Sequence, residues 1–125
     1  MKYSRSHEWA FIEGSKARIG LTEYGRKELG EIVYVEFPEI GHLCHPGDEV
    51  AILESTKAAA DFSTPLKGKV VRINSQLVKD SDLINQSPEE SGWLFEIELS
   101  HPEEAKALLS KEEYLALLTL CTRQK

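Results

Sequence analysis

Over most of the chain, hydrophobic positions fall in short runs that are broken by turn residues. The runs Glu8–Glu13 and 16–20 flank Gly14-Ser15 and predict a β-hairpin. The run 32–37 is rich in β-branched and aromatic residues, which favour strands. The last five residues of 93–99 alternate between apolar and polar, as in a half-buried strand. The pattern therefore predicts a mainly β protein.

Helix signals are fewer and depend on capping residues. Thr22 is placed to cap a short helix that ends at Gly30. The run 100–109 opens with a capping box that contains a proline, and it predicts a second helix. The run 110–118 opens with another capping box and predicts a third. We expect one domain over residues 1–125, with a core at about 3–118 and a frayed tail at 119–125.

The size and the apolar content of the chain limit its class. With 125 residues it can build one modest hydrophobic core, and we expect a monomer. No apolar run is long enough to cross a bilayer, so no membrane association is expected. Residues 1–9 lack the apolar segment of a secretory signal. These features favour a cytoplasmic protein, although a mature form in the mitochondrial matrix would look the same.

Charge and cysteine content exclude further classes. The chain has 21 acidic and 15 basic residues, a formal net charge of -6. Such a surface repels phosphate backbones, and no basic stripe with interleaved aromatic residues offsets it, so nucleic-acid binding is not expected. Cys44 and Cys121 lie far apart in the sequence, which favours two free thiols in a reducing compartment.

The segment His42-Leu43-Cys44-His45 raises the possibility of a metal site or a catalytic thiol. A closed zinc site needs four ligands, and the other candidates are scattered along the chain without paired spacing. A nucleophilic Cys44 would need an orienting third group, and nothing near it in the sequence suggests one. We therefore expect no metal and no catalytic residue, with a Cys44-based enzyme as a distant alternative.

A lysine lies at the predicted tip of a central hairpin. Two strand-like runs, 50–54 and 60–64, flank residues 55–59, which places Lys57 at or near the turn. The small residues that follow Lys57 leave its amine sterically open. A lysine that a modifying enzyme must reach needs this kind of presentation, although an exposed lysine on a turn is usually only solvated.

The sequence around this lysine resembles a known attachment motif. Glu54-Ser55-Thr56-Lys57-Ala58 is similar to the lipoyl-attachment site shared by the acyltransferases of 2-oxo acid dehydrogenases and by glycine cleavage H proteins. A biotin carrier would have methionines on both sides of its lysine, which this chain lacks. The wider resemblance, from about residue 3 to 118, is to the H protein, and it rests on His7-Glu8-Trp9, 20–24, 29–38, 54–71 and 92–94.

Resemblance to the H protein implies a fold and a function. The implied fold is a lipoyl-domain-like barrel-sandwich hybrid, with a short helix in the N-terminal half and C-terminal helices packed on it. The implied function is that of a non-catalytic carrier with lipoate joined to Lys57 through an amide. The arm would shuttle an aminomethyl group between glycine decarboxylase, aminomethyltransferase and dihydrolipoamide dehydrogenase, after a lipoate-attaching enzyme has modified the lysine.

The resemblance also implies two residues that contact the loaded arm. The glutamate of the His-Glu-Trp motif and the aspartate four residues after the lipoyl lysine correspond to Glu8 and Asp61. Carboxylates hold an ammonium group by charge-assisted hydrogen bonds. Otherwise both residues would be solvated acids on strands. Neighbouring His7 and Trp9 are expected to shape the groove or the core.

One segment departs from the family pattern. Pro88-Glu89-Glu90-Ser91 replaces a glycine-rich turn that usually carries an aromatic residue. The added negative charge could change docking to one partner. It leaves open an H-like protein that stores or relays lipoate, or that serves another lipoate-dependent redox pathway.

Overall fold

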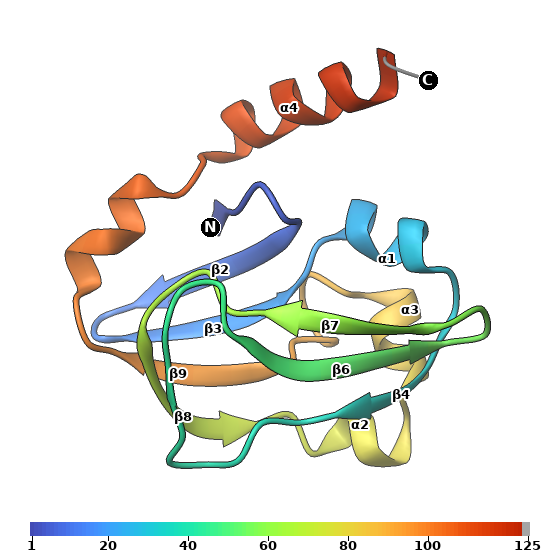
Figure 1. The fold of residues 1–125 in the computed structure, drawn as a ribbon, viewed down its shortest axis with the longest axis horizontal. Coiled ribbons are helices and arrows are strands. Elements are labelled where there is room, and N and C mark those ends of the chain that lie inside the picture. The colour runs from blue at the N-terminus through green and yellow to red at the C-terminus, as the bar shows by residue number, and fades with distance from the viewer. Residues whose placement is uncertain (124–125) are drawn as a thin grey trace.

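The computed structural model describes residues 1–123, and it consists of two antiparallel sheets with short helices around them (Figure 1). The larger sheet has the strand order β1-β2-β3-β9-β8-β5, and the smaller one has the order β4-β6-β7. The strands are β1 (Lys2–Tyr3), β2 (Glu8–Glu13), β3 (Lys16–Leu21), β4 (Ile32–Glu36), β5 (Leu43–Cys44), β6 (Glu49–Ser55), β7 (Ala59–Ser63), β8 (Gly68–Ile73) and β9 (Phe95–Leu99). The mainly β fold expected from the sequence is confirmed.

The hydrophobic core lies between the two sheets. Ile19 and Phe95 from the larger sheet and Leu53 and Phe62 from the smaller one are all buried in a single cluster. The rings of Phe62 and Phe95 meet edge to face with centroids 6.0 Å apart, which joins the two sheets directly. This packing fixes the β6–β7 hairpin relative to the larger sheet.

The described part of the chain has five helical segments, and α4 extends away from the two sheets (Figure 1). They are α1 (Glu23–Leu29), α2 (Gln76–Lys79), α3 (Asp82–Gln86), the 3-10 helix η1 (Pro102–Ala107) and α4 (Lys111–Arg123). Among the described residues, no helix is both long enough and apolar enough to cross a membrane.

The start and the end of α1 follow the sequence prediction. Gly25 N donates to Thr22 Oγ1 at 3.1 Å, which satisfies one of the unpaired amides of the first turn. Gly30 closes the helix with φ +86°, a backbone conformation that glycine adopts without steric cost. A second cap comes from the acidic loop, because Glu23 N donates to Glu89 Oε2 at 2.9 Å.

Replacing Glu89 by alanine is expected to lower the free energy of unfolding by about 1 kcal/mol, because α1 loses a charged cap at its N-terminus. The measurement is a urea unfolding curve. Glu90→Ala removes the same charge from an exposed neighbour and is expected to leave the curve unchanged. Equal destabilisation by both variants would contradict the capping role.

The C-terminal region differs from the sequence prediction at two points. The run 100–109 is not one helix. Only residues 102–107 are helical, and they form the 3-10 helix η1. Leu109 is extended, because it exchanges two backbone hydrogen bonds with Tyr3, of 2.8 and 2.7 Å. The tail predicted at 119–125 is also wrong in part, since α4 continues to Arg123. Residues 124–125 lie outside the described part.

The capping box that opens the last helix is confirmed. Ser110 N donates to Glu113 Oε1 at 2.9 Å, and Glu113 N donates to Ser110 Oγ at 3.2 Å. Tyr114, in the next turn, stacks on Tyr3 with ring centroids 4.7 Å apart. These contacts attach α4 to β1, beside the segment that leads into β2.

Candidate functional site

The tip of the β6–β7 hairpin is a braced turn. Glu54 pairs with Ala59, and Ser55 N donates to Ala58 O at 2.8 Å. Ser55 Oγ also accepts hydrogen bonds from the backbone amides of Lys57 at 3.1 Å and Ala58 at 3.2 Å. Lys57 is exposed at this tip, where the sequence predicts it. The hairpin therefore presents the lysine from a fixed backbone.

The aliphatic stem of Lys57 lies against the end of α1. A Cβ atom at Gly30 would be 3.6 Å from both Cδ and Cε of Lys57. The backbone on either side is also joined, since Thr56 N donates to Glu31 O at 3.0 Å. Figure 1 shows the chain after α1 running past the β6–β7 tip. The lysine thus starts beside the last turn of α1.

A cavity of about 180 Å³ is lined by residues from this last turn and from both sheets. It brings together Glu8 at the start of β2 and Asp61 on β7, the two acidic residues that the resemblance implies. Glu28 from α1 is a third carboxylate in the lining. The full lining is Ser6, His7, Glu8, Leu21, Gly25, Glu28, Leu29, Leu53, Ala60, Asp61 and Phe62.

Glu28 is a site residue that the sequence reasoning missed. The sequence predicts the helix that ends at Gly30, and it separately predicts the hairpin tip that carries Lys57. Nothing in the sequence shows that the two meet, since their contact depends on how the sheets pack. The last turn of α1 lines the cavity only because the sheets pack in this way.

Glu8 is buried, with only 5% of its surface exposed. Ser4 Oγ and Ser6 Oγ donate to Glu8 Oε1 at 2.7 and 3.0 Å. Burial raises the pKa of the Glu8 carboxyl, and the two hydroxyl bonds partly oppose this by stabilising the charge. Both bonds end on Oε1, and within the described residues Oε2 accepts none. Oε2 is therefore an acceptor available to a ligand.

His7 shapes the same cavity. It has φ +69°, the one positive value among the described residues other than glycine. Its Nδ1 lies 2.8 Å from Tyr114 OH, and its ring packs on Tyr24 with centroids 4.7 Å apart. Burial lowers the pKa of His7, which outweighs the opposite effect of nearby Glu28. The imidazole is therefore held largely neutral at pH 7 and does not offset the carboxylates.

The lining has the chemistry to hold a small cation on an aliphatic chain. Glu8, Asp61 and Glu28 supply negative charge, whereas Leu53 and Phe62 supply apolar wall. Charge-assisted hydrogen bonds to carboxylates are about twice as strong as neutral ones, and apolar walls limit access of water.

The alternative sites have less structural support. Within the described residues, no group of three or more His, Cys, Asp and Glu side chains could hold a metal ion. Cys44 is a free thiol, completely buried in β5. Burial raises the pKa of the Cys44 thiol, which reduces the thiolate fraction on which nucleophilic attack depends.

Comparison with known proteins assigns the chain to a family. The glycine cleavage H-protein family matches residues 1–120. The chain belongs to the glycine cleavage H-protein family. Among curated relatives, the H protein of Thermotoga maritima is 44% identical over 113 residues, which cover 90% of this chain and 91% of the relative. The mitochondrial H protein 2 of Arabidopsis thaliana is 42% identical over 114 residues, which cover 91% of this chain and 73% of the relative.

Solved structures give the same assignment. The crystal structure of an H protein from Mycobacterium marinum superposes with a TM-score of 0.80 at 29% sequence identity, and the match covers 92% of this chain and 93% of that one. H proteins are lipoyl-carrier subunits and not catalysts. Membership of the family implies that the other enzymes of the glycine cleavage system are partners.

Proposed function

We propose that this H protein carries lipoate as an amide on Lys57 Nζ, and that Glu8 and Asp61 contact the arm when it is loaded. The observation that carries the proposal is the position of an exposed lysine, at a braced hairpin tip, beside a cavity that contains both carboxylates. An isolated solvated lysine would need neither the brace nor the cavity.

The residues present fit such a group. The Lys57 stem already lies over Gly30, so an extension of it starts next to the last turn of α1. Apolar walls suit methylene groups, and the carboxylates suit a terminal ammonium. When bound, lipoate would supply a disulfide whose two-electron reduction leaves one sulfur able to carry an aminomethyl group.

The residues of the chain would then bind the loaded arm and protect its cargo from water. Glu8 Oε2 would accept a hydrogen bond from an ammonium group on the arm, while Ser4 and Ser6 hold Oε1 and fix the orientation of the carboxylate. Asp61 approaches from β7, and Glu28 adds negative charge from α1. Leu53 and Phe62 would limit the access of water to the carbon next to that ammonium group, where hydrolysis would release the cargo.

Four enzymes are proposed to meet the arm, in the cytoplasm. One attaches lipoate, and the others are glycine decarboxylase, aminomethyltransferase and dihydrolipoamide dehydrogenase. The acidic loop at residues 88–91 gives little support to the alternative of another lipoate-dependent pathway. Glu89 is half-buried and accepts a hydrogen bond from the α1 backbone, whereas Glu90 is exposed to partners.

The decisive experiment measures exchange of label between bicarbonate and the glycine carboxyl group, with purified glycine decarboxylase and the lipoylated chain. We expect exchange that depends on the lipoylated form, with the unmodified chain as control. A lipoylated chain that supports no exchange would overturn the pathway and favour storage or relay of lipoate. A chain that a competent host never lipoylates would overturn the carrier function itself.

A further inference from the structure

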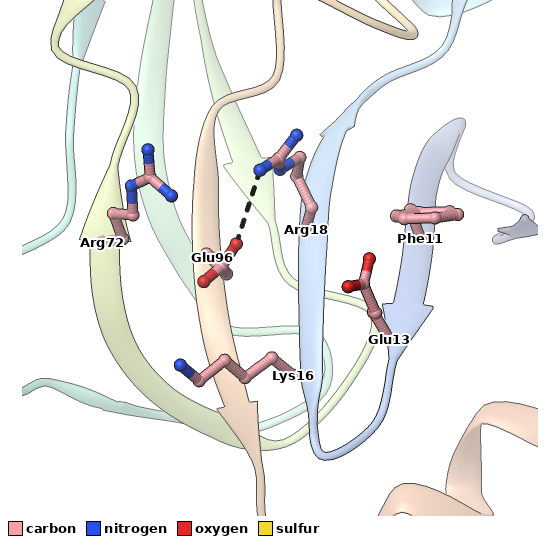
Figure 2. A pocket seen from close by; sticks show the side chains of 6 residues that line it. All are labelled: Phe11, Glu13, Lys16, Arg18, Arg72 and Glu96. Atoms are coloured by element: carbon pink, nitrogen blue, oxygen red, sulfur yellow. Dashed lines mark ion pairs between the residues drawn. The ribbon is translucent and has the colours of Figure 1, made fainter.

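The outer face of the larger sheet carries charges in cross-strand rows. In one row, Lys16 and Lys69 flank Glu98. In the next, Arg18 on β3 and Arg72 on β8 flank Glu96 on β9. Figure 2 shows Glu96 between the two arginines. One carboxylate thus lies between two guanidinium groups.

A tryptophan holds both arginines in place. The Cζ atoms of Arg18 and Arg72 lie 4.6 and 5.4 Å from the ring centroid of Trp93. Only 8% of Trp93 is exposed, so the ring is a fixed platform on which the two cations are arranged by cation–π contacts. The positive charges of Arg18 and Arg72 are therefore held near the same ring, with one carboxylate, that of Glu96, between them.

The single glutamate does not satisfy both groups. Glu96 forms an ion pair with Arg18 at 3.8 Å, and its side chain is only 15% exposed. The Nε atom of Arg18 is buried without a hydrogen-bond partner. Within the described part of the chain, Arg72 forms no ion pair within 4.0 Å. The guanidinium of Arg72 is left to solvent or to a ligand.

Arg18, Arg72 and Glu96 line a cavity of about 310 Å³ (Figure 2). Its lining adds Lys16, Glu13 and Phe11 to the row described above, so three cations face two carboxylates, an excess of one positive charge. The whole chain has a net charge of -6, which makes this excess unusual for the molecule. The single negative charge of one carboxylate balances this positive charge. The charge of a phosphate monoester, roughly -1.5 to -2, would exceed it.

We propose that this cavity binds the side-chain carboxylate of an acidic segment on a partner protein. Arg72 offers a planar fork that pairs with a carboxylate through two parallel hydrogen bonds, and Lys16 adds positive charge. Phe11, which is 45% exposed, lines the cavity and provides an apolar wall for the methylene stem of a glutamate. The cavity shares no residue with the one beside Lys57, so a docked partner leaves the arm free.

The test uses the full chain and a capped tri-glutamate peptide, followed by NMR of the indole N–H groups. The protein has two tryptophans. Trp93 reports on the cavity through its contacts with Arg18 and Arg72. Trp9 is an internal reference because its Nε1 donates to Pro88 O at 2.9 Å inside the protein. We expect a saturable shift of the Trp93 signal alone.

Two variants of equal charge separate recognition from bulk electrostatics. Arg72→Gln is expected to weaken peptide binding about tenfold, because the bidentate fork is lost. Lys69→Gln removes one positive charge from the same face of the sheet, outside the cavity, and is expected to change binding less than about twofold.

Four outcomes would overturn the proposal. They are the absence of a saturable shift, equal weakening by the two variants, tighter binding of inorganic phosphate at the same ionic strength, and binding of acetate as tight as that of the peptide. The third would indicate a phosphate ligand, and the fourth a free small carboxylate in place of a protein segment.

Discussion

Lys57→Arg is expected to abolish lipoylation completely while leaving the fold intact. Arginine keeps the positive charge and an aliphatic stem that can lie over Gly30. Its guanidinium does not lose a proton at neutral pH and therefore cannot act as the nucleophile that forms the amide. The measurement is the intact mass of the protein from a host that makes and attaches lipoate, where the wild-type chain gains one lipoyl adduct.

A matched control makes this result specific. Lys79→Arg is the same substitution at an exposed lysine on α2, and it is expected to leave the adduct in place. An adduct on the Lys57→Arg variant would move the attachment to another lysine and contradict the proposed site. Unchanged urea unfolding of both variants is expected, because neither removes a buried contact.

Glu8→Gln is expected to shorten the lifetime of the loaded carrier by roughly 10- to 100-fold, because a hydrogen bond to a charged group contributes about 1.5–3 kcal/mol. Glutamine keeps an oxygen for Ser4 and Ser6 but offers the ammonium no negative charge. Lipoylation itself is expected to be unaffected. The measurement is the rate at which the aminomethyl-loaded protein releases formaldehyde or ammonia into buffer.

The same substitution is expected to raise the stability of the unmodified protein. Burial raises the pKa of Glu8, so the folded state binds a proton there more tightly than the unfolded state does. The stabilisation from this proton is complete below the pKa of the unfolded state and is lost as the pH rises through the raised value. At a pH above the raised value the charged carboxylate therefore costs stability, and Glu8→Gln is expected to raise the free energy of unfolding by about 1 kcal/mol.

Urea unfolding at pH 7 and at pH 4 measures this gain, which is expected to shrink in acid as the wild-type carboxyl becomes protonated. Asp61→Asn is the control, since Asp61 is exposed, and it is expected to change the unfolding free energy by less than about 0.5 kcal/mol. A Glu8→Gln variant with unchanged lifetime and unchanged stability would remove Glu8 from the site.

Features set by neighbouring residues were predictable from the sequence. Thr22 and Gly30 bound α1 through caps that involve residues three or four positions away. Ser110 opens α4 for the same reason. The hairpin that carries Lys57 follows from two strand-like runs around a short polar turn. In each case the physical cause lies within a few residues of the effect.

Features set by distant residues were not predictable in this way. Helices α2 and α3 have one turn each, which is too short for a hydrophobic period to show. Contacts across the fold hold α3, because Asn85 accepts from the backbone N–H of Ile32 at 2.8 Å and donates to its C=O at 2.9 Å. The third carboxylate of the cavity, Glu28, likewise depends on how α1 meets the β6–β7 hairpin.

The braced turn under Lys57 affects how tightly the cavity must bind its guest. Ser55 holds the backbone on both sides of the lysine, so only rotatable bonds beyond its Cα separate the end of the arm from the cavity. A short flexible tether gives an effective concentration of about 1 mM or more. A cavity that binds the untethered ligand with a Kd of about 0.01 mM is then about 99% occupied, which allows protection of up to about 100-fold. Weak affinity is therefore sufficient for protection, and it lets the arm leave quickly when an enzyme docks.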